Sequence, residues 1–270
     1  MSGLRRPAVR DRDMGVAKVQ TVVLEREPTL DGVARSRVGA RPTGAGGVHR
    51  LRLMRDASGV LTIELGSDAG AIVRAVRAAA GDARNRVVIL RGIESELALG
   101  LVATNRVLEA LASLPMPVIA AVEADAHAHP EIALTADVVI AGAKATFGYA
   151  APLAARGSAD DAIRALWRHR IGRDPAEAFL SSPWPLSARR ACAWTLVSEV
   201  VESGGALRRA RALAELYLAV PEGTRQRLRT AFIEPVGRIL AQSVCGDSSA
   251  AEIGEIGSVA PASHGVSFAA

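Results

Sequence analysis

The sequence of 270 residues predicts an α/β fold with a helical carboxyl-terminal portion. Short apolar runs typical of buried strands alternate with amphipathic helical segments up to about residue 148, and helical periodicity alone fills the chain from residue 158 onward. Hydrophobic residues make up 49% of the chain and aromatic residues only 3%, so Ala, Val, Leu and Ile must build the core. This length is enough for one sizeable core and one appended segment.

Strand and helix signals alternate in the first part of the chain. Two apolar runs flank the tetrapeptide DASG at 56–59, which predicts a β-hairpin. Pro115 ends the last helical pattern of this part, because proline cannot continue a helix. The elements expected before Pro115 are strands at 19–24, 49–54 and 60–65, a helix at 69–80, a strand at 86–91 and a helix at 102–114.

The segment 115–148 carries the strongest functional signal. It predicts a buried strand at 117–122, a turn, a short apolar helix at 131–136 and a second buried strand at 137–141. Where a strand leads directly into a helix, the helix presents unpaired N–H groups and the positive end of its dipole. These groups stabilise a bound anion or a developing oxyanion, so we expect a site at this turn.

The second half is organised around helices, expected at 160–170, 175–181, 188–193, 206–219 and 222–243. The chain as a whole divides into four parts. These are a basic, disordered leader at 1–47, an α/β core at 48–200, a carboxyl-terminal helical region at 201–244, and a disordered tail at 245–270.

The net charge of +5 lies entirely in the amino-terminal segment. Residues 1–50 contain ten basic and five acidic residues, so residues 51–270 contain 23 of each. A neutral body with few aromatic residues argues against nucleic-acid binding. Cys192 and Cys245 are too few for a disulfide framework, and no apolar run reaches the roughly 18 residues of a membrane span. We therefore expect a cytoplasmic protein without a membrane partner.

Four short motifs resemble those of one enzyme superfamily. PVIAAVE at 117–123, Glu131, TADVVIAG at 135–142 and ATFG at 145–148 are similar, in order and spacing, to the core of the crotonase (enoyl-CoA hydratase/isomerase) superfamily. Residues 168–201 resemble a later segment of that family. The resemblance implies a crotonase-like ββα spiral core, with a homotrimer or hexamer assembled through the carboxyl-terminal helices.

The resemblance also implies a chemical device. In this family two backbone N–H groups hold a thioester carbonyl and stabilise an enolate. By the same likeness, Leu99 and Gly100 match the first donor turn, and counting back from Glu131 places the second donor at Ala128. Glu131 matches the first catalytic carboxylate, but Ala151 stands where the family has a second one. No cofactor is implied, since CoA or a carrier protein would arrive as part of the substrate.

Two histidines, His127 and His129, flank Ala128 in the turn. Three interpretations stay open for them: a metal site with nearby carboxylates, a general acid/base that replaces the absent carboxylate, or a structural role. No third ligand has supporting spacing, so we expect no metal. The candidate catalytic residues are therefore Glu131, His127 and His129.

The function expected from these features is a divergent crotonase-fold enzyme acting on an acyl-CoA or acyl-carrier-protein thioester through an enolate. Adding water to an enoyl thioester needs two carboxylates, whereas isomerisation or carbon–carbon cleavage needs only one acid/base. The alternative is a catalytically silent crotonase-fold subunit that binds or stabilises a partner protein.

Overall fold

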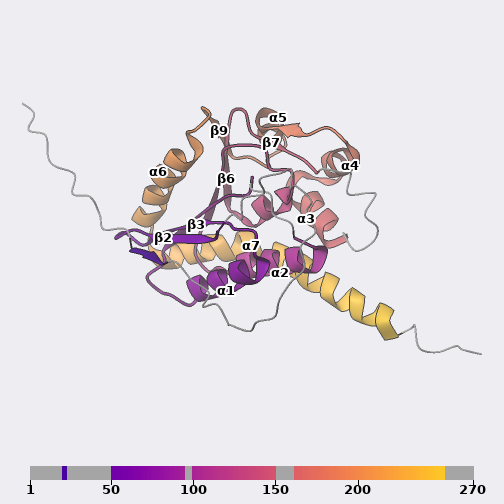
Figure 1. The fold of residues 1–270 in the computed structure, drawn as a ribbon, viewed down its shortest axis with the longest axis horizontal. Helices are drawn as coiled ribbons and strands as arrows, with labels where there is room; N and C mark the ends of the chain where they lie inside the picture. The colour runs from indigo at the N-terminus through magenta and orange to yellow at the C-terminus, as the bar shows by residue number, and fades with distance from the viewer. Residues whose placement is uncertain (1–19, 23–49, 95–98, 150–160, 253–270) are drawn as a thin grey trace, which may run out of the picture.

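A seven-stranded sheet forms the centre of the protein (Figure 1). The structure is a computed structural model and describes residues 20–22, 50–94, 99–149 and 161–252. The strand order is β1-β2-β3-β4-β5-β6-β9, antiparallel from β1 to β3 and parallel from β3 to β9. The strands are β1 (Gln20–Val22), β2 (Arg52–Arg55), β3 (Val60–Glu64), β4 (Val87–Arg91), β5 (Val118–Val122), β6 (Val138–Gly142) and β9 (Glu199–Val201).

The hairpin predicted around DASG joins β2 to β3. Asp56 Oδ1 accepts hydrogen bonds from the backbone N–H groups of Ser58 and Val60, which closes the turn. Gly59 has a φ of +91°, and a Cβ there would lie 2.7 Å from the carbonyl oxygen of Arg84, so only glycine fits. The strand expected at 19–24 is also confirmed, since β1 pairs with β2.

The central parallel strands β4 and β5 are short and buried on both faces. All five residues of β5 are buried, as are the first four of β4, which explains their continuous apolar runs. Their in-register pairing, such as Ile89 with Ile119, brings the carboxyl ends of β4 and β5 to the same edge of the sheet. That edge is where ligands bind in open parallel sheets.

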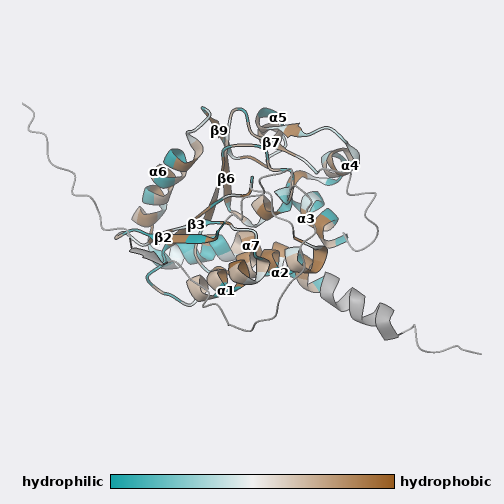
Figure 2. Ribbon diagram, viewed as in Figure 1, coloured by the Kyte–Doolittle hydropathy of each residue, from teal (hydrophilic) through white to brown (hydrophobic). Residues whose placement is uncertain are grey.

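Helices cover both faces of the sheet (Figure 1). On one face lies α6 (Ala206–Ala219), whose residues Ala206, Ala210 and Ala214 pack on strand side chains such as Ile89 and Ile119. Figure 2 shows hydrophilic as well as hydrophobic residues along α6. The other face is covered by α1 (Ala69–Ala80), α2 (Leu101–Ala112) and α7 (Glu222–Glu252).

The remaining elements form a smaller layer beside the sheet. They are the 3-10 helix η1 (Pro130–Thr135), the two-stranded sheet of β7 (Thr146–Phe147) and β8 (Leu186–Ser187), and the helices α3 (Asp161–Ile171), α4 (Arg173–Ser181) and α5 (Ala188–Ala193). The element expected as a helix at 131–136 is thus a 3-10 helix. It has only six residues between Pro130 and the next strand, and short segments of this kind often form 3-10 turns.

Two expected boundaries differ from the structure. Helix α7 continues to Glu252, so the tail assignment is wrong for 245–252, because adding a residue to an existing helix costs little. In addition, α6 packs directly on the sheet. The helical region expected from residue 201 onward therefore belongs to the same core as residues 48–200. The rest of the expected leader, 1–19 and 23–47, and the tail from 253 lie outside the described residues. No helix in the described part of the chain is long and apolar enough to cross a membrane.

One buried arginine ties α7 to the rest of the core. The Arg229 side chain is 1% exposed and donates to the carbonyl oxygens of Leu111, Leu114 and Thr135. It also pairs with Asp137 Oδ2 at 3.1 Å. A single guanidinium therefore joins α7 to the end of α2, the end of η1 and the start of β6.

We predict that Arg229→Met destabilises the protein strongly, by about 3–5 kcal/mol, because it leaves the buried Asp137 carboxylate without its cation. Urea unfolding measures the change. The matched control is Arg227→Met on the same helix, which is exposed and should change stability by no more than about 0.5 kcal/mol. Equal effects of the two substitutions would contradict this interpretation.

Candidate active site

The candidate site lies at the carboxyl edge of the parallel strands. After β4 the chain passes through Leu99 and Gly100 into α2, and after β5 it passes through a turn into η1. Helices α2 and η1 pack against each other, with Thr104 Oγ1 of α2 lying 3.4 Å from His129 Nδ1. The two donor turns expected from the sequence therefore meet at this edge.

Glu131 is buried in the site, with a relative exposure of 1%. Its Oε1 lies 2.8 Å from Nδ1 of His129, which is itself buried. Its Oε2 accepts a hydrogen bond of 2.8 Å from the Tyr149 hydroxyl, and Trp167 Nε1 donates to that hydroxyl at 2.8 Å. His129 thus holds one carboxylate oxygen and Tyr149, which follows β7, holds the other, while Trp167 of α3 holds the Tyr149 hydroxyl.

Backbone pairing between the turn and β7 explains how these groups meet. The Ala126 N–H donates to the Thr146 carbonyl, and the Gly148 N–H donates to the Ala126 carbonyl. The chain beyond β7 therefore runs beside the turn, which places Tyr149 next to Glu131. Pro130 at the first position of η1 fixes the start of that helix, where its missing N–H costs nothing.

His127 has different partners from His129. Its Nε2 lies 2.7 Å from Thr146 Oγ1, which in turn donates to Asp125 Oδ1 at 2.7 Å. The structure therefore brings His129 together with Glu131, and it directs His127 toward β7. Within the described ranges, no cluster of three or more His, Cys, Asp or Glu side chains is arranged to hold a metal ion.

The expected oxyanion donors are open. In the part of the chain that the structure describes, the backbone N–H groups of Leu99, Gly100 and Ala128 have no hydrogen-bond acceptor. Gly100 is the N-cap of α2 and supplies no side-chain cap, so the first turn of α2 also presents unpaired N–H groups. Both features suit an anionic or polarised oxygen.

A groove of about 670 Å³ opens at the amino ends of α1 and α2. Two arginines, Arg74 and Arg106, lie on its wall together with Gly100. The other lining residues are Ala69, Gly70, Val73, Leu101, Val102 and Ala103. The groove thus combines an apolar lining with two cations and an uncapped helix end. Thr104, which bonds to the Gly100 carbonyl, connects this turn to His129.

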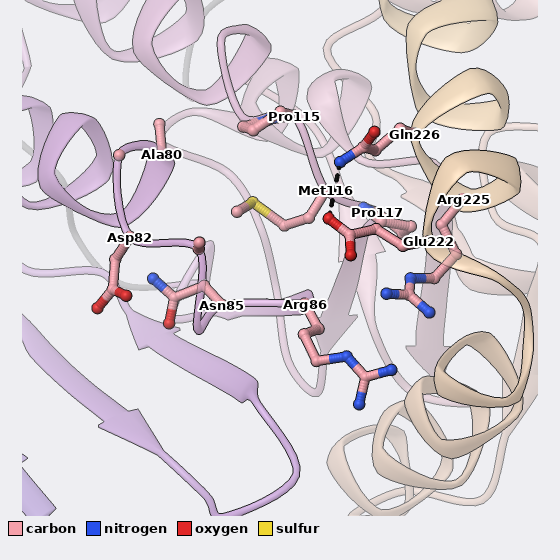
Figure 3. Close-up of a pocket in the computed structure, with 12 residues that line it drawn as sticks. Ala80, Asp82, Asn85, Arg86, Pro115, Met116, Pro117, Glu222, Arg225 and Gln226 are labelled. Carbon is pink, nitrogen blue, oxygen red and sulfur yellow. Dashed lines mark hydrogen bonds between the residues drawn. The ribbon is translucent and has the colours of Figure 1, made fainter.

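A smaller cavity, of about 230 Å³, lies at the opposite end of the strands (Figure 3). Its lining residues Arg86 and Pro117 immediately precede β4 and β5, whereas the candidate site follows them. Figure 3 shows the Arg86 and Arg225 guanidinium groups and, above them in the view, the hydrogen bond from Gln226 to Glu222. None of the candidate site residues lines this cavity.

Comparison with known proteins identifies the family. The sequence profile of the enoyl-CoA hydratase/isomerase family matches residues 101–252, more than half of the chain. The chain belongs to this family. No curated protein sequence matches it. The α/β sheet with helical carboxyl-terminal region is the crotonase fold expected from the sequence.

Solved structures agree with this assignment. An enoyl-CoA hydratase from Mycobacterium avium subsp. paratuberculosis is 25% identical, with a TM-score of 0.61, over 75% of this chain and 90% of that one. A β-diketone hydrolase from the cyanobacterium Anabaena is 23% identical, with a TM-score of 0.62, over 71% of this chain and 88% of that one. The second likeness is evidence for the fold alone. This chain is therefore a divergent member of the family.

Sequence reasoning missed two members of the site. Tyr149 follows directly after the ATFG motif, and Trp167 lies in the helix expected at 160–170, but neither was among the candidate site residues. The available signal for Tyr149 was its place directly after the ATFG motif. The position of the absent second carboxylate, Ala151, lies outside the described residues.

Another carboxylate at the same edge, Glu94 after β4, gives a prediction of pH dependence. Burial raises the pKa of Glu94, and among the residues that the structure describes its Oε2 has no hydrogen-bond partner. Just above the ordinary pKa of about 4.3, the folded protein holds a proton there that the unfolded chain has released. The free energy of unfolding therefore falls as the pH rises through this window.

We predict that Glu94→Gln removes this part of the decline and raises the free energy of unfolding at pH 7 by about 1 kcal/mol. Urea unfolding at several pH values between 4 and 7.5 measures it. Glu202→Gln, at an exposed position, is the control. If the wild-type and Glu94→Gln curves run parallel over this range, the buried carboxylate does not contribute as described.

Proposed function

We propose that this chain is a crotonase-fold enzyme that acts on an acyl-CoA or acyl-carrier-protein thioester through an enolate. The observation that carries the proposal is the buried pair of Glu131 and His129, with 2.8 Å between Oε1 and Nδ1, beside open backbone N–H groups. A buried carboxylate that holds one imidazole nitrogen leaves the other nitrogen to exchange protons with a substrate.

The proton would move as follows. His129 Nε2, which makes no hydrogen bond within the described part of the chain, takes a proton from the carbon next to the thioester carbonyl. The electron pair of that C–H bond moves into the carbonyl, whose oxygen becomes an enolate oxyanion. The N–H groups of Leu99, Gly100 and Ala128 stabilise the oxyanion. Returning the proton to another carbon completes an isomerisation.

In this scheme Glu131 holds His129 and does not itself touch the substrate. Its two oxygens already accept hydrogen bonds, so it orients the imidazole and stabilises its protonated form. A single acid/base of this kind suits isomerisation or carbon–carbon cleavage. Hydration would need a second group to position the water, so an isomerase or lyase is favoured over a hydratase.

The groove between α1 and α2 suits the carrier part of such a substrate. CoA and the phosphopantetheine arm of a carrier protein share an apolar and amide-rich arm that ends in phosphate. Arg74 and Arg106 on the groove wall supply charge for the phosphate, and the uncapped end of α2 supplies N–H groups. The proposal includes a cytoplasmic enzyme that forms a homotrimer or hexamer.

Substitution of the pair tests the catalytic role. His129→Gln is expected to lower kcat on a turned-over thioester at least about a hundredfold, the usual range for a lost general acid/base. Glu131→Gln is expected to lower kcat by at least about a hundredfold as well, because the imidazole loses the carboxylate that orients it and stabilises its protonated form. His169→Gln, on the basic end of α3, is the control. A loss after His127→Gln as large as that after His129→Gln would move the role to His127, and unchanged turnover after both would contradict the proposal.

Binding is tested separately by calorimetric titration with a short acyl-CoA and with an acyl-carrier protein. We expect micromolar affinity for one of them, and an affinity about tenfold weaker in Arg74→Ala and Arg106→Ala, which remove a charge-assisted contact. The control is Arg77→Ala, which lies on α1 like Arg74 but outside the groove. Failure to bind either thioester would favour the silent partner subunit instead.

A further inference from the structure

The carboxylate of Glu131 is held by a second pair of side chains from outside its own turn. Tyr149 follows β7, and Trp167 lies on α3, where its side chain is fully buried. Trp167 Nε1 donates to the Tyr149 hydroxyl oxygen at 2.8 Å, and the Tyr149 hydroxyl donates to Glu131 Oε2 at 2.8 Å. Four side chains thus form one continuous chain of hydrogen bonds that ends at His129.

The indole of Trp167 fixes which group donates and which accepts in these hydrogen bonds. An indole N–H can only donate, so the Tyr149 oxygen accepts from Trp167 and directs its own proton to Glu131. An ionised Glu131 can only accept, and it does so through both oxygens. For His129 Nδ1 to bond with Oε1 it must carry the proton, which leaves Nε2 as the nitrogen with a free lone pair.

Packing holds the tyrosine and the indole in place. Both rings lie against Phe179 of α4, with centroid distances of 5.8 Å for Tyr149 and 4.6 Å for Trp167. Side chains locked by such contacts keep a neighbouring polar group in a single orientation. The position of the Tyr149 hydroxyl is therefore set by Trp167 of α3 and Phe179 of α4.

We propose that Tyr149 and Trp167 are positioning residues that fix the tautomer of His129 through Glu131. Their task is to keep the proton on Nδ1 so that Nε2 is always the nitrogen ready to accept one. The catalytic use of Nε2 rests on the proposed function, whereas the fixed tautomer does not. The two parts can therefore fail separately.

Long-range ¹H–¹⁵N correlation spectra of the full-length protein test the tautomer without any substrate. They distinguish protonated from unprotonated ring nitrogens, and His129→Gln assigns the signal. We expect wild-type His129 to carry its proton on Nδ1. Tyr149→Phe keeps the ring on Phe179 but removes the hydroxyl, so a mixture of the two tautomers should appear, and a similar mixture is expected after Trp167→Phe.

Two matched controls separate positioning from general loss of structure. Tyr217→Phe alters the other tyrosine of the chain, on α6, and Trp184→Phe alters a tryptophan that is 78% exposed. Both should leave the His129 pattern unchanged. An Nε2-protonated His129 in the wild-type protein, or an unchanged Nδ1-protonated pattern after both Tyr149→Phe and Trp167→Phe, would overturn the proposal.

Kinetics on a turned-over thioester give a second readout. Tyr149→Phe should lower kcat about tenfold or more with little change in KM, because positioning partners of a reacting group typically contribute factors of about 10–100. A change confined to KM would contradict the positioning role. If no thioester is turned over, the proposed function fails, and the tautomer spectra still decide the role of Tyr149 and Trp167.

Discussion

The hydrogen bonds of Arg229 are the constraint on which the rest of the structure depends. This one side chain satisfies carbonyl oxygens at the ends of α2 and η1 and binds the carboxylate at the start of β6. Because η1 carries Glu131, the arginine that fixes the carboxyl end of η1 also limits where that carboxylate can lie. The fold and the candidate site thus share one anchor.

Burying this ion pair is costly, and its surroundings show how the cost is offset. Burial raises the pKa of Asp137 and lowers the pKa of Arg229, since each charge loses contact with water. The pair is tolerated because both groups make further hydrogen bonds. Asp137 also accepts from the Val118 N–H, and Arg229 also donates to three carbonyl oxygens. Such an interaction specifies one arrangement of α7 more than it adds stability.

The candidate site follows the same logic of a buried charge held by several donors. Glu131 contacts His129 from its own turn and Tyr149 from the segment after β7. The Tyr149 hydroxyl in turn accepts a hydrogen bond from Trp167 of α3. Elements distant in sequence therefore converge on one carboxylate. The family resemblance centres on that carboxylate. In the function proposed above, Glu131 keeps this place but His129 moves the proton.

The sequence by itself determined the family, the alternation of strands and helices, and the position of the site after the strand at 117–122. Those features depend on local patterns: period, turn residues such as DASG, and spaced motifs. Only the tertiary structure decided the hydrogen-bond partners of His127 and His129, because the folding of β7 and η1 around the turn brings Thr146 to His127 and Glu131 to His129. Hydrogen bonds between distant segments leave no period in the sequence, which is why Tyr149 and Trp167 became visible only in the fold.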